Sequence, residues 1–345
     1  MSSGKGPDNG TGSSPAIAVS NLVKRYSKSK TNAVDGVSFE VSRGEIFGLL
    51  GPNGAGKTTT IGVLTTAIVP TEGTASIMDA DVARDPIGIK QRIAVVPQQS
   101  NLDRSLKVRE ILTFHAAYHG VPRKTREALA DRLLGELGLG ERKNEKVNRY
   151  SGGMAQRLMI ARALMHAPDV LFLDEPTNNL DPQSRLFLWE RIREMNARGL
   201  TILLTTHDMD EADKLCHRIA VMDHGKILVN DTPAELKKLI PGGTVLEVRA
   251  FAASDTERAG EAVGAALTAI PGVTKVEKEG QKDGATEAAV EPGALTFRLY
   301  GLNANTWIGP AAQAVLAAGA EVRDLSVKRP TLEEVFIFLT GRHLR

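Results

Sequence analysis

The chain has 345 residues, a formal net charge of +2 and one cysteine. This length accommodates one large domain and a smaller one. The near-neutral charge argues against a dedicated nucleic-acid surface, which would need a concentrated basic face, and a single cysteine excludes an intrachain disulfide. Because no run of about eighteen apolar residues occurs, we expect no membrane-spanning helix.

Residues 1–15 are rich in serine and glycine and lack the apolar segment of a signal peptide. Such a composition cannot bury enough apolar surface to offset the entropy lost on ordering. We therefore predict a disordered leader over this segment.

A phosphate-binding loop is predicted directly after the apolar run Glu45-Ile-Phe-Gly-Leu-Leu50, which has the pattern of a buried strand. The loop reads Gly51-Pro-Asn53-Gly54-Ala-Gly56-Lys57-Thr58-Thr59, a Walker A sequence. Its glycines let successive backbone N–H groups point inward, Lys57 would contact the β- and γ-phosphates, and the Thr58 hydroxyl would ligate magnesium. A glycine-rich turn without a ligand would have no use for Lys57 and Thr58 together. The segment predicts binding of a nucleoside triphosphate.

A second apolar run, Asp169-Val-Leu-Phe-Leu-Asp174, ends in the carboxylate pair Asp174-Glu175. In open α/β sheets nucleotides bind at the carboxyl ends of the strands, where we expect Asp174 to hold magnesium through water. Glu175 would then polarise the attacking water as general base. Alone, this segment is better explained as a solvated acidic turn, but a Walker A loop earlier in the chain favours a Walker B strand.

A third segment combines Tyr150-Ser151-Gly152-Gly153-Met154 with the helical run Met159-Ile-Ala-Arg-Ala-Leu-Met165. A Ser-Gly-Gly turn that opens a helix offers a hydroxyl, close backbone approach and a helix N-terminus, which together suit an anion. By itself such a turn is usually only a helix cap. In order with the two phosphate motifs, this segment resembles the signature of ATP-binding cassette (ABC) proteins. The resemblance covers roughly residues 16–240.

The resemblance implies an α/β P-loop NTPase fold at residues 16–240, with a helical subdomain at about residues 99–160. It implies that ATP and Mg²⁺ bind, and that residues 151–153 of one chain contact the γ-phosphate held by a second copy. Tyr150 and Met154 stand where leucine and glutamine are usual in the family. Neither position supplies the hydroxyl or the backbone groups, so we expect nucleotide clamping to be retained.

Four further positions match the family pattern in the expected order. Tyr26 resembles the aromatic residue that stacks on adenine, although alone it fits a half-buried strand tyrosine. Gln98 resembles the glutamine that reaches magnesium and the attacking water, with Gln99 as the neighbouring alternative. Asp181 resembles the aspartate of the loop that crosses the dimer interface, and alone it fits the start of a helix. His207 resembles the switch histidine that contacts the γ-phosphate.

The remaining candidate residues have ordinary interpretations. Cys216 lies in the helical stretch 209–217 and is interpreted as a buried structural thiol. Histidines 115, 119 and 166 have no comparable setting, so we interpret them as surface or helix residues.

Residues 241–345 do not belong to the cassette, and their pattern predicts a small accessory α+β domain. Alternating segments predict strands at residues 244–250, 273–278, 295–300 and 320–326, with helices at residues 255–270 and 306–318. The order β-α-β-β-α-β suggests a ferredoxin-like fold. After it, Thr331 could cap a helix that Gly341 ends. The domain is interpreted as a packing or dimerisation module, with a small-molecule sensor as the alternative.

Residues 330–336, Pro-Thr-Leu-Glu-Glu-Val-Phe, together with the signature, resemble the daunorubicin-resistance type of bacterial drug-export ATPases. A similar cassette also occurs in nodulation-factor and polysaccharide exporters. The resemblance implies a homodimer that powers a separate multi-span permease from the cytoplasmic side of the bacterial plasma membrane, with export favoured over import. The alternative is an ABC ATPase that acts on DNA or ribosomes. The interval between the Walker motifs lacks sustained heptads and the chain carries one cassette, so no nucleic-acid partner is expected.

Overall fold

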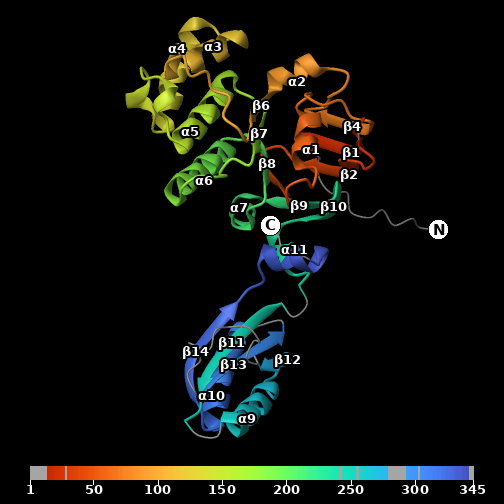
Figure 1. Cartoon of the computed structure of the whole chain (residues 1–345), viewed down its shortest axis with the longest axis vertical. Helices are drawn as coiled ribbons and strands as arrows, with labels where there is room; N and C mark the ends of the chain where they lie inside the picture. Colours follow the sequence, from red (N-terminus) through yellow and green to blue (C-terminus); the bar gives the residue numbers. More distant parts are fainter. Residues whose placement is uncertain are drawn as a thin grey trace, which may run out of the picture. The chain divides into compact units, whose positions relative to one another are not determined.

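The computed structural model describes residues 14–27, 29–240, 243–253, 256–278, 293–301 and 304–341. All but the last two residues of the predicted leader lie outside these ranges. The described residues form two compact units, the first up to Pro233 and the second starting at Ala234. Figure 1 labels most of the helices and strands of both units.

A six-stranded sheet forms the centre of the first unit, in the order β10-β9-β3-β8-β7-β6. The neighbours from β9 to β6 pair in parallel, and only β10 is antiparallel to its neighbour β9. Strands β3, β7 and β8 are buried along their whole length, as expected for apolar runs that are covered on both faces. The strands are β3 (Ile46–Leu50), β6 (Ile93–Val96), β7 (Val170–Asp174), β8 (Thr201–Thr206), β9 (Arg218–Asp223) and β10 (Lys226–Asp231).

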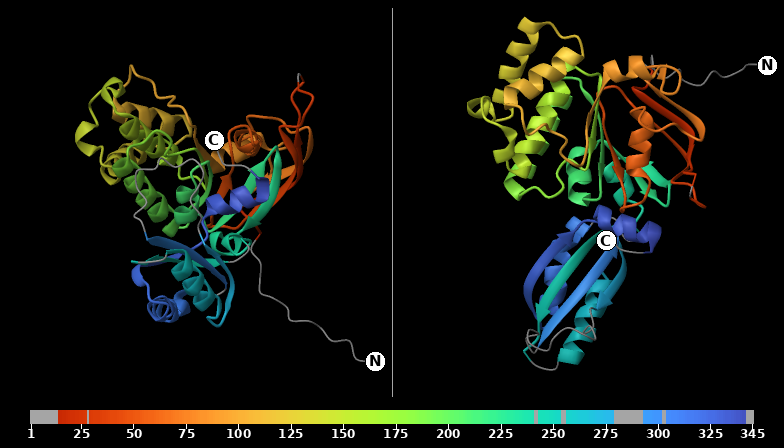
Figure 2. Two further views of the ribbon diagram at one scale, coloured as in Figure 1. Left: turned by 60° about the horizontal axis from the view of Figure 1, so that its bottom comes forward. Right: turned by 45° about the horizontal axis from the view of Figure 1, so that its top comes forward.

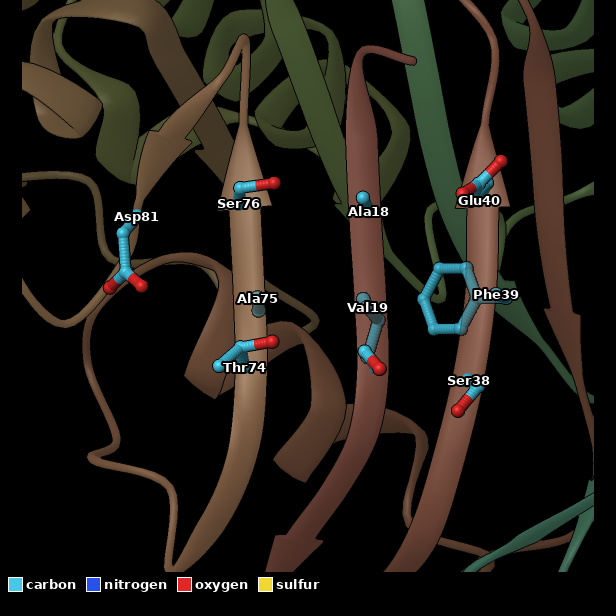
Figure 3. A pocket seen from close by; sticks show the side chains of 10 residues that line it. Ala18, Val19, Ser38, Phe39, Glu40, Thr74, Ala75, Ser76 and Asp81 are labelled. Atoms are coloured by element: carbon cyan, nitrogen blue, oxygen red, sulfur yellow. The ribbon is translucent and has the colours of Figure 1, made fainter. Parts of the chain in front are cut away.

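A second, antiparallel sheet in this unit has the order β2-β1-β4-β5. Its buried side chains join one core cluster with those of β3 and of helix α1 (Lys57–Leu64), and the stacked rings of Phe39 and Phe47 link the two sheets. Residues of all four strands, among them Ser38, Thr74 and Asp81, line a hollow over this sheet (Figure 3). The strands are β1 (Ile17–Lys24), β2 (Val34–Val41), β4 (Glu72–Ile77) and β5 (Ala80–Asp81).

Helices α3, α4 and α5 pack against one another in the region predicted as a helical subdomain, and α5 continues past the predicted end at about residue 160. Figure 2 shows them on one side of the six-stranded sheet, with the antiparallel sheet on the other. The buried Cys216 ends α7, as expected for a structural thiol. The helices of this unit are α2 (Pro86–Arg92), α3 (Val108–Tyr118), α4 (Arg123–Glu136), α5 (Gly152–Ala163), α6 (Pro182–Ala197) and α7 (Met209–Leu215), with 3₁₀ turns η1 (Gly140–Arg142), η2 (Val147–Arg149) and η3 (Leu164–His166).

The second unit contains a four-stranded antiparallel sheet in the order β12-β13-β11-β14. Helices α9 and α10 pack on this sheet. Alternate residues of β13 are buried in the core between the sheet and these helices. The element order is the predicted β-α-β-β-α-β; the predicted second helix begins as a 3₁₀ turn that ends at the buried Trp307. The elements are α8 (Pro233–Lys237), β11 (Thr244–Phe251), α9 (Thr256–Thr268), β12 (Val273–Lys278), β13 (Ala294–Gly301), η4 (Ala304–Trp307), α10 (Ile308–Ala317) and β14 (Glu321–Lys328).

The last helix, α11 (Leu332–Thr340), is capped at both ends as predicted. The Thr331 hydroxyl accepts the backbone N–H of Glu334 at 3.2 Å, and the Glu334 carboxylate accepts the N–H of Thr331 at 2.8 Å. Gly341 ends the helix with a φ of 70°, which glycine adopts at no steric cost. Within the described residues, none of the helices combines the length and hydropathy needed to cross a bilayer.

Candidate active site

The carboxyl ends of three adjacent strands create the site. Leu50 of β3 pairs with Thr206 of β8, and Asp174 of β7 pairs with Thr205 of β8. Since the strands are parallel, the residues that follow them emerge at the same edge of the sheet. This register brings the phosphate loop, Glu175 and His207 together from three separate segments.

The predicted phosphate loop connects β3 to α1 and has no room for larger residues at two of its glycines. A Cβ on Gly51 would lie 2.2 Å from the Met222 carbonyl oxygen. Gly56 has a φ of 104°, and a Cβ there would lie 2.5 Å from the carbonyl oxygen of Ala33. Asn53 and Gly54 are exposed at the outer part of the loop. Gly51 and Gly56 are therefore required by the close packing of the loop against the neighbouring backbone.

Lys57 is buried inside this loop. Its Nζ donates to the carbonyl oxygens of Gly51 at 2.7 Å and Pro52 at 3.2 Å, and it lies 3.5 Å from Glu175 Oε1. Burial lowers the pKa of Lys57, and the charges of Glu175 and Asp174 partly oppose that shift. Because the ammonium is largely desolvated, phosphate oxygens would meet a charge that bulk water screens only weakly.

The residues predicted to hold magnesium also lie together. Thr58 Oγ1 lies 3.5 Å from Asp174 Oδ1, and the buried Asp174 carboxylate accepts a 2.5 Å hydrogen bond from the Thr205 hydroxyl. Hydroxyl and carboxylate oxygens are the hard ligands that Mg²⁺ prefers. This donor set fits a magnesium ion next to the phosphate loop.

Four side chains converge on the carboxylate of Glu175. Gln98 Nε2 donates to its Oε2 at 2.9 Å, and Asn178 Nδ2 donates to the same oxygen at 3.2 Å. His207 Nδ1 lies 3.3 Å and Lys57 Nζ 3.5 Å from the other oxygen, Oε1. The carboxylate is thus fixed in position at the carboxyl edge of the sheet, where a general base for an attacking water would be needed.

The backbone of Glu175 is strained. Its φ is 48°, in the left-handed region that a non-glycine residue rarely adopts. Two hydrogen bonds hold this conformation, because the N–H of Glu175 donates to both the carbonyl oxygen and the hydroxyl of Thr205, each at 3.1 Å. Such strain concentrates at functional sites.

Two residues of this constellation, Asn178 and Thr205, were not predicted. Thr205 shows a weak signal in the sequence, since a threonine pair ends an otherwise apolar strand. Asn178 lies between the predicted Glu175 and Asp181 but has no pattern of its own. Only the pairing of β7 with β8 places the Thr205 hydroxyl beside Asp174.

We expect Thr205→Val to lower the free energy of unfolding of the cassette by about 1–3 kcal/mol. Valine keeps the shape of threonine but leaves the buried Asp174 carboxylate without its 2.5 Å donor. Urea unfolding measures the change, and Thr205→Ser, which retains the hydroxyl, is the matched control. A valine variant as stable as the unmodified protein would contradict the importance of this bond.

Tyr26 lies beyond the end of β1 and is 44% exposed, so its interpretation as a half-buried strand residue is wrong. Its hydroxyl is 3.4 Å from Thr59 Oγ1, next to the phosphate loop. The ring therefore stands beside the start of α1. Stacking on adenine stays a prediction for this side chain.

The signature segment and Asp181 lie at the starts of two helices, α5 and α6. Ser151 caps α5, where its Oγ accepts the N–H of Met154 at 3.3 Å. Asp181 caps α6 by accepting the N–H of Ser184, and a Cβ on Gly153 would lie 2.7 Å from the Ser184 hydroxyl. By contrast, a Cβ added to Gly152 would have no other atom within 4 Å. In the described part of the chain, no hydrogen bond of residues 151–153 reaches the phosphate loop, so their role at a phosphate stays a prediction.

Comparison with known proteins identifies relatives over nearly the whole length of the chain. Residues 34–178 match the ABC transporter family. The chain is 37% identical to the daunorubicin resistance ATP-binding protein DrrA3 of Streptomyces coeruleorubidus, over 94% of this chain and 96% of that protein. It is 38% identical to the Nod factor export ATP-binding protein I of Ralstonia nicotianae, over 98% of both.

Solved structures give the same result for the first unit. The structure of an ABC transporter ATP-binding subunit superposes with a TM-score of 0.60 at 31% identity, covering 65% of this chain and 92% of that one. A dimeric ATP-binding cassette with ADP and phosphate bound, in a post-hydrolysis state, gives 0.58 at 26% identity, covering 63% of this chain and 98% of that one. The chain therefore belongs to the ATP-binding subunits of ABC transporters, a family of ATPases.

Proposed function

We propose that two copies of this protein bind Mg-ATP between them and use its hydrolysis to drive a separate membrane permease that exports an amphipathic compound. The observation that carries the proposal is the convergence of Lys57, Gln98 and His207 on the buried Glu175 carboxylate. This arrangement provides a phosphate-binding cation beside a fixed base, which are the parts that phosphoryl transfer to water needs.

In this proposal each chain supplies part of its partner's site. The phosphate loop of one chain binds ATP, while Ser151, Gly152 and Gly153 of the other contact the γ-phosphate and Asp181 lies at the interface. The cap of α5 at Ser151 supports this role, since a helix N-terminus favours an anion. The ATP-binding cassette solved as a dimer is consistent with such a pair.

Hydrolysis in this proposal depends on residues at the carboxyl edge of the central sheet. Thr58, Asp174 and Gln98 would hold Mg²⁺, which would neutralise charge on the phosphates. Glu175 accepts the proton of the attacking water, and His207, which contacts it at 3.3 Å, positions that carboxylate near the γ-phosphate. Tyr26 stacks on the adenine. Closing and reopening of the pair gives ATP control over a conformational change in the permease.

The relatives support the transport part of the proposal. Proteins named for daunorubicin resistance and for Nod factor export align with 94% and 98% of this chain, including the second unit. We infer that the protein binds peripherally to the cytoplasmic side of a bacterial plasma membrane, through contacts with a multi-span permease. The alternative, action on DNA or ribosomes, has no support from these relatives.

Copurification tests the proposal. The tagged Glu175→Gln protein is expressed in its native cell, membranes are solubilised gently in the presence of ATP, and the bound proteins are identified. A multi-span membrane protein in near-equal amount is the expected result. Ribosomal proteins or DNA without a membrane partner would overturn the transport proposal and leave the ATPase assignment unaffected.

We also propose that the second unit steadies the dimer. Leu316 of α10 and Phe338 of α11 are apolar and more than half exposed, so each is available for contact with another chain. Truncation after Gly243 is therefore expected to weaken ATP-dependent dimerisation, measured by sedimentation of the Glu175→Gln protein with ATP. Unchanged dimerisation and turnover in the truncated protein would exclude this role.

A further inference from the structure

Three histidines that were interpreted as ordinary helix or surface residues form a cluster in the helical part of the first unit. His115 lies on α3, His119 ends the same helix four residues later, and His166 ends the 3₁₀ turn η3. One ring nitrogen from each lies within 4.8 Å of the other two. The spacing of four residues puts the first two on one helix face, and only the fold adds the third.

The hydrogen bonds of the cluster leave ring nitrogens available. His166 Nε2 lies 2.9 Å from the carbonyl oxygen of Ile93, which can only accept, so the proton is on Nε2 and the lone pair on Nδ1. Among the described residues, neither this Nδ1 nor the Nδ1 of His119 has a hydrogen-bond partner, although both atoms are buried. A histidine that donates one N–H to a backbone carbonyl and offers its other nitrogen is the usual arrangement of a metal ligand.

The surroundings of the three imidazoles favour their neutral form. Burial lowers the pKa of all three, and that of His115 falls to about 4 with contributions from His119, Arg162 and His166. Arg162 is the neighbouring cation, and its Nη2 donates to Asn101 Oδ1 at 2.6 Å.

We propose that His115, His119 and His166 bind a divalent transition-metal ion of the Zn²⁺ class, with water as a fourth ligand. Three imidazoles suit zinc, cobalt, nickel or copper and do not suit Mg²⁺ or Ca²⁺. Ligand nitrogens about 2.0–2.1 Å from zinc in a tetrahedron lie roughly 3.3 Å apart. The rings of His119 and His166 are stacked at 3.9 Å and 7°, so one ring turns about its Cβ–Cγ bond when the ion binds.

The site is separate from the ATP site. His166 precedes β7 and contacts Ile93, the first residue of β6, whereas Glu175 follows the other end of β7. The ion would link α3 to the 3₁₀ turn η3, which precedes strand β7 of the central sheet. Metal binding would therefore stiffen the helical part of the cassette, and the ion would take no part in ATP hydrolysis.

Cobalt titration of the full chain, without nucleotide or magnesium, tests the proposal, because Co²⁺ bound by three imidazoles absorbs in the visible range. One Co²⁺ per chain that zinc displaces is expected. His119→Gln and His166→Gln are each expected to weaken binding at least tenfold, as loss of one ligand implies. His224→Asn, at a turn between β9 and β10 with its side chain 80% exposed, is the control and should bind like the unmodified protein.

A second measurement separates loss of a ligand from loss of the fold. Zinc should raise the melting temperature of the unmodified protein and of His224→Asn, but not of His119→Gln, while all three melt at similar temperatures without metal. His115→Gln provides an independent variant on α3. Equal cobalt spectra and affinities for the unmodified protein and all cluster variants would overturn the proposal, as would the absence of saturable binding to a folded unmodified protein.

Discussion

Glu175→Gln is expected to lower ATP turnover at least about 100-fold while ATP still binds. Glutamine has the shape of glutamate but cannot accept the proton of the attacking water. It can still hydrogen-bond to its neighbours, whereas the ion pair with Lys57, 3.5 Å in the unmodified protein, is lost. Phosphate release measures the turnover, and fluorescent ATP measures binding. We also expect the variant to accumulate as a dimer with ATP, since closure is no longer followed by hydrolysis.

A buried glutamate elsewhere in the same unit provides the control. Glu45 is 7% exposed and pairs with Arg218 at 2.7 Å, at the opposite end of β3 from the phosphate loop. Glu45→Gln also removes a buried charge, so it reproduces the effect on folding without touching the site. Normal steady-state turnover in Glu175→Gln would reject Glu175 as the base. Equal losses in both variants would assign the effect to stability.

Lys57→Ala is expected to weaken ATP binding about 10- to 100-fold, because hydrogen bonds to a charged group contribute about 1.5–3 kcal/mol. The variant loses the desolvated ammonium that the loop holds through the carbonyl oxygens of Gly51 and Pro52. The variant also removes the cation that lies 3.5 Å from the buried Glu175 carboxylate. Equilibrium titration with fluorescent ATP gives the affinity, and circular dichroism confirms the fold.

Lys143→Ala is the matched control for this change. Lys143 pairs with Asp131 at 3.3 Å on the surface of the helical region, so its loss removes a lysine without touching the phosphate loop. We expect its ATP affinity to equal that of the unmodified protein. If Lys57→Ala bound ATP with the same affinity as Lys143→Ala, the predicted contact of Lys57 with phosphate would be wrong.

The sequence by itself determined those features that depend on a few consecutive residues. The phosphate loop is one, because strand, glycines, lysine and helix follow one another and each has a local conformational reason. The caps of α11 at Thr331 and Gly341 are another, and alternation alone predicted the strands of the second unit. Motif order then sufficed to predict the P-loop fold class and the family.

Only the tertiary structure decided which distant side chains share a site. The pairing of β7 with β8 puts the Thr205 hydroxyl beside Asp174, and it holds Glu175 in a left-handed conformation that no local pattern predicts. Likewise, His166 reaches the histidines of α3 only because α5 and η3 pack against that helix. Periodicity specifies the direction of a side chain within its own element, whereas contacts between elements depend on sheet register and helix packing, which emerge when the whole core assembles.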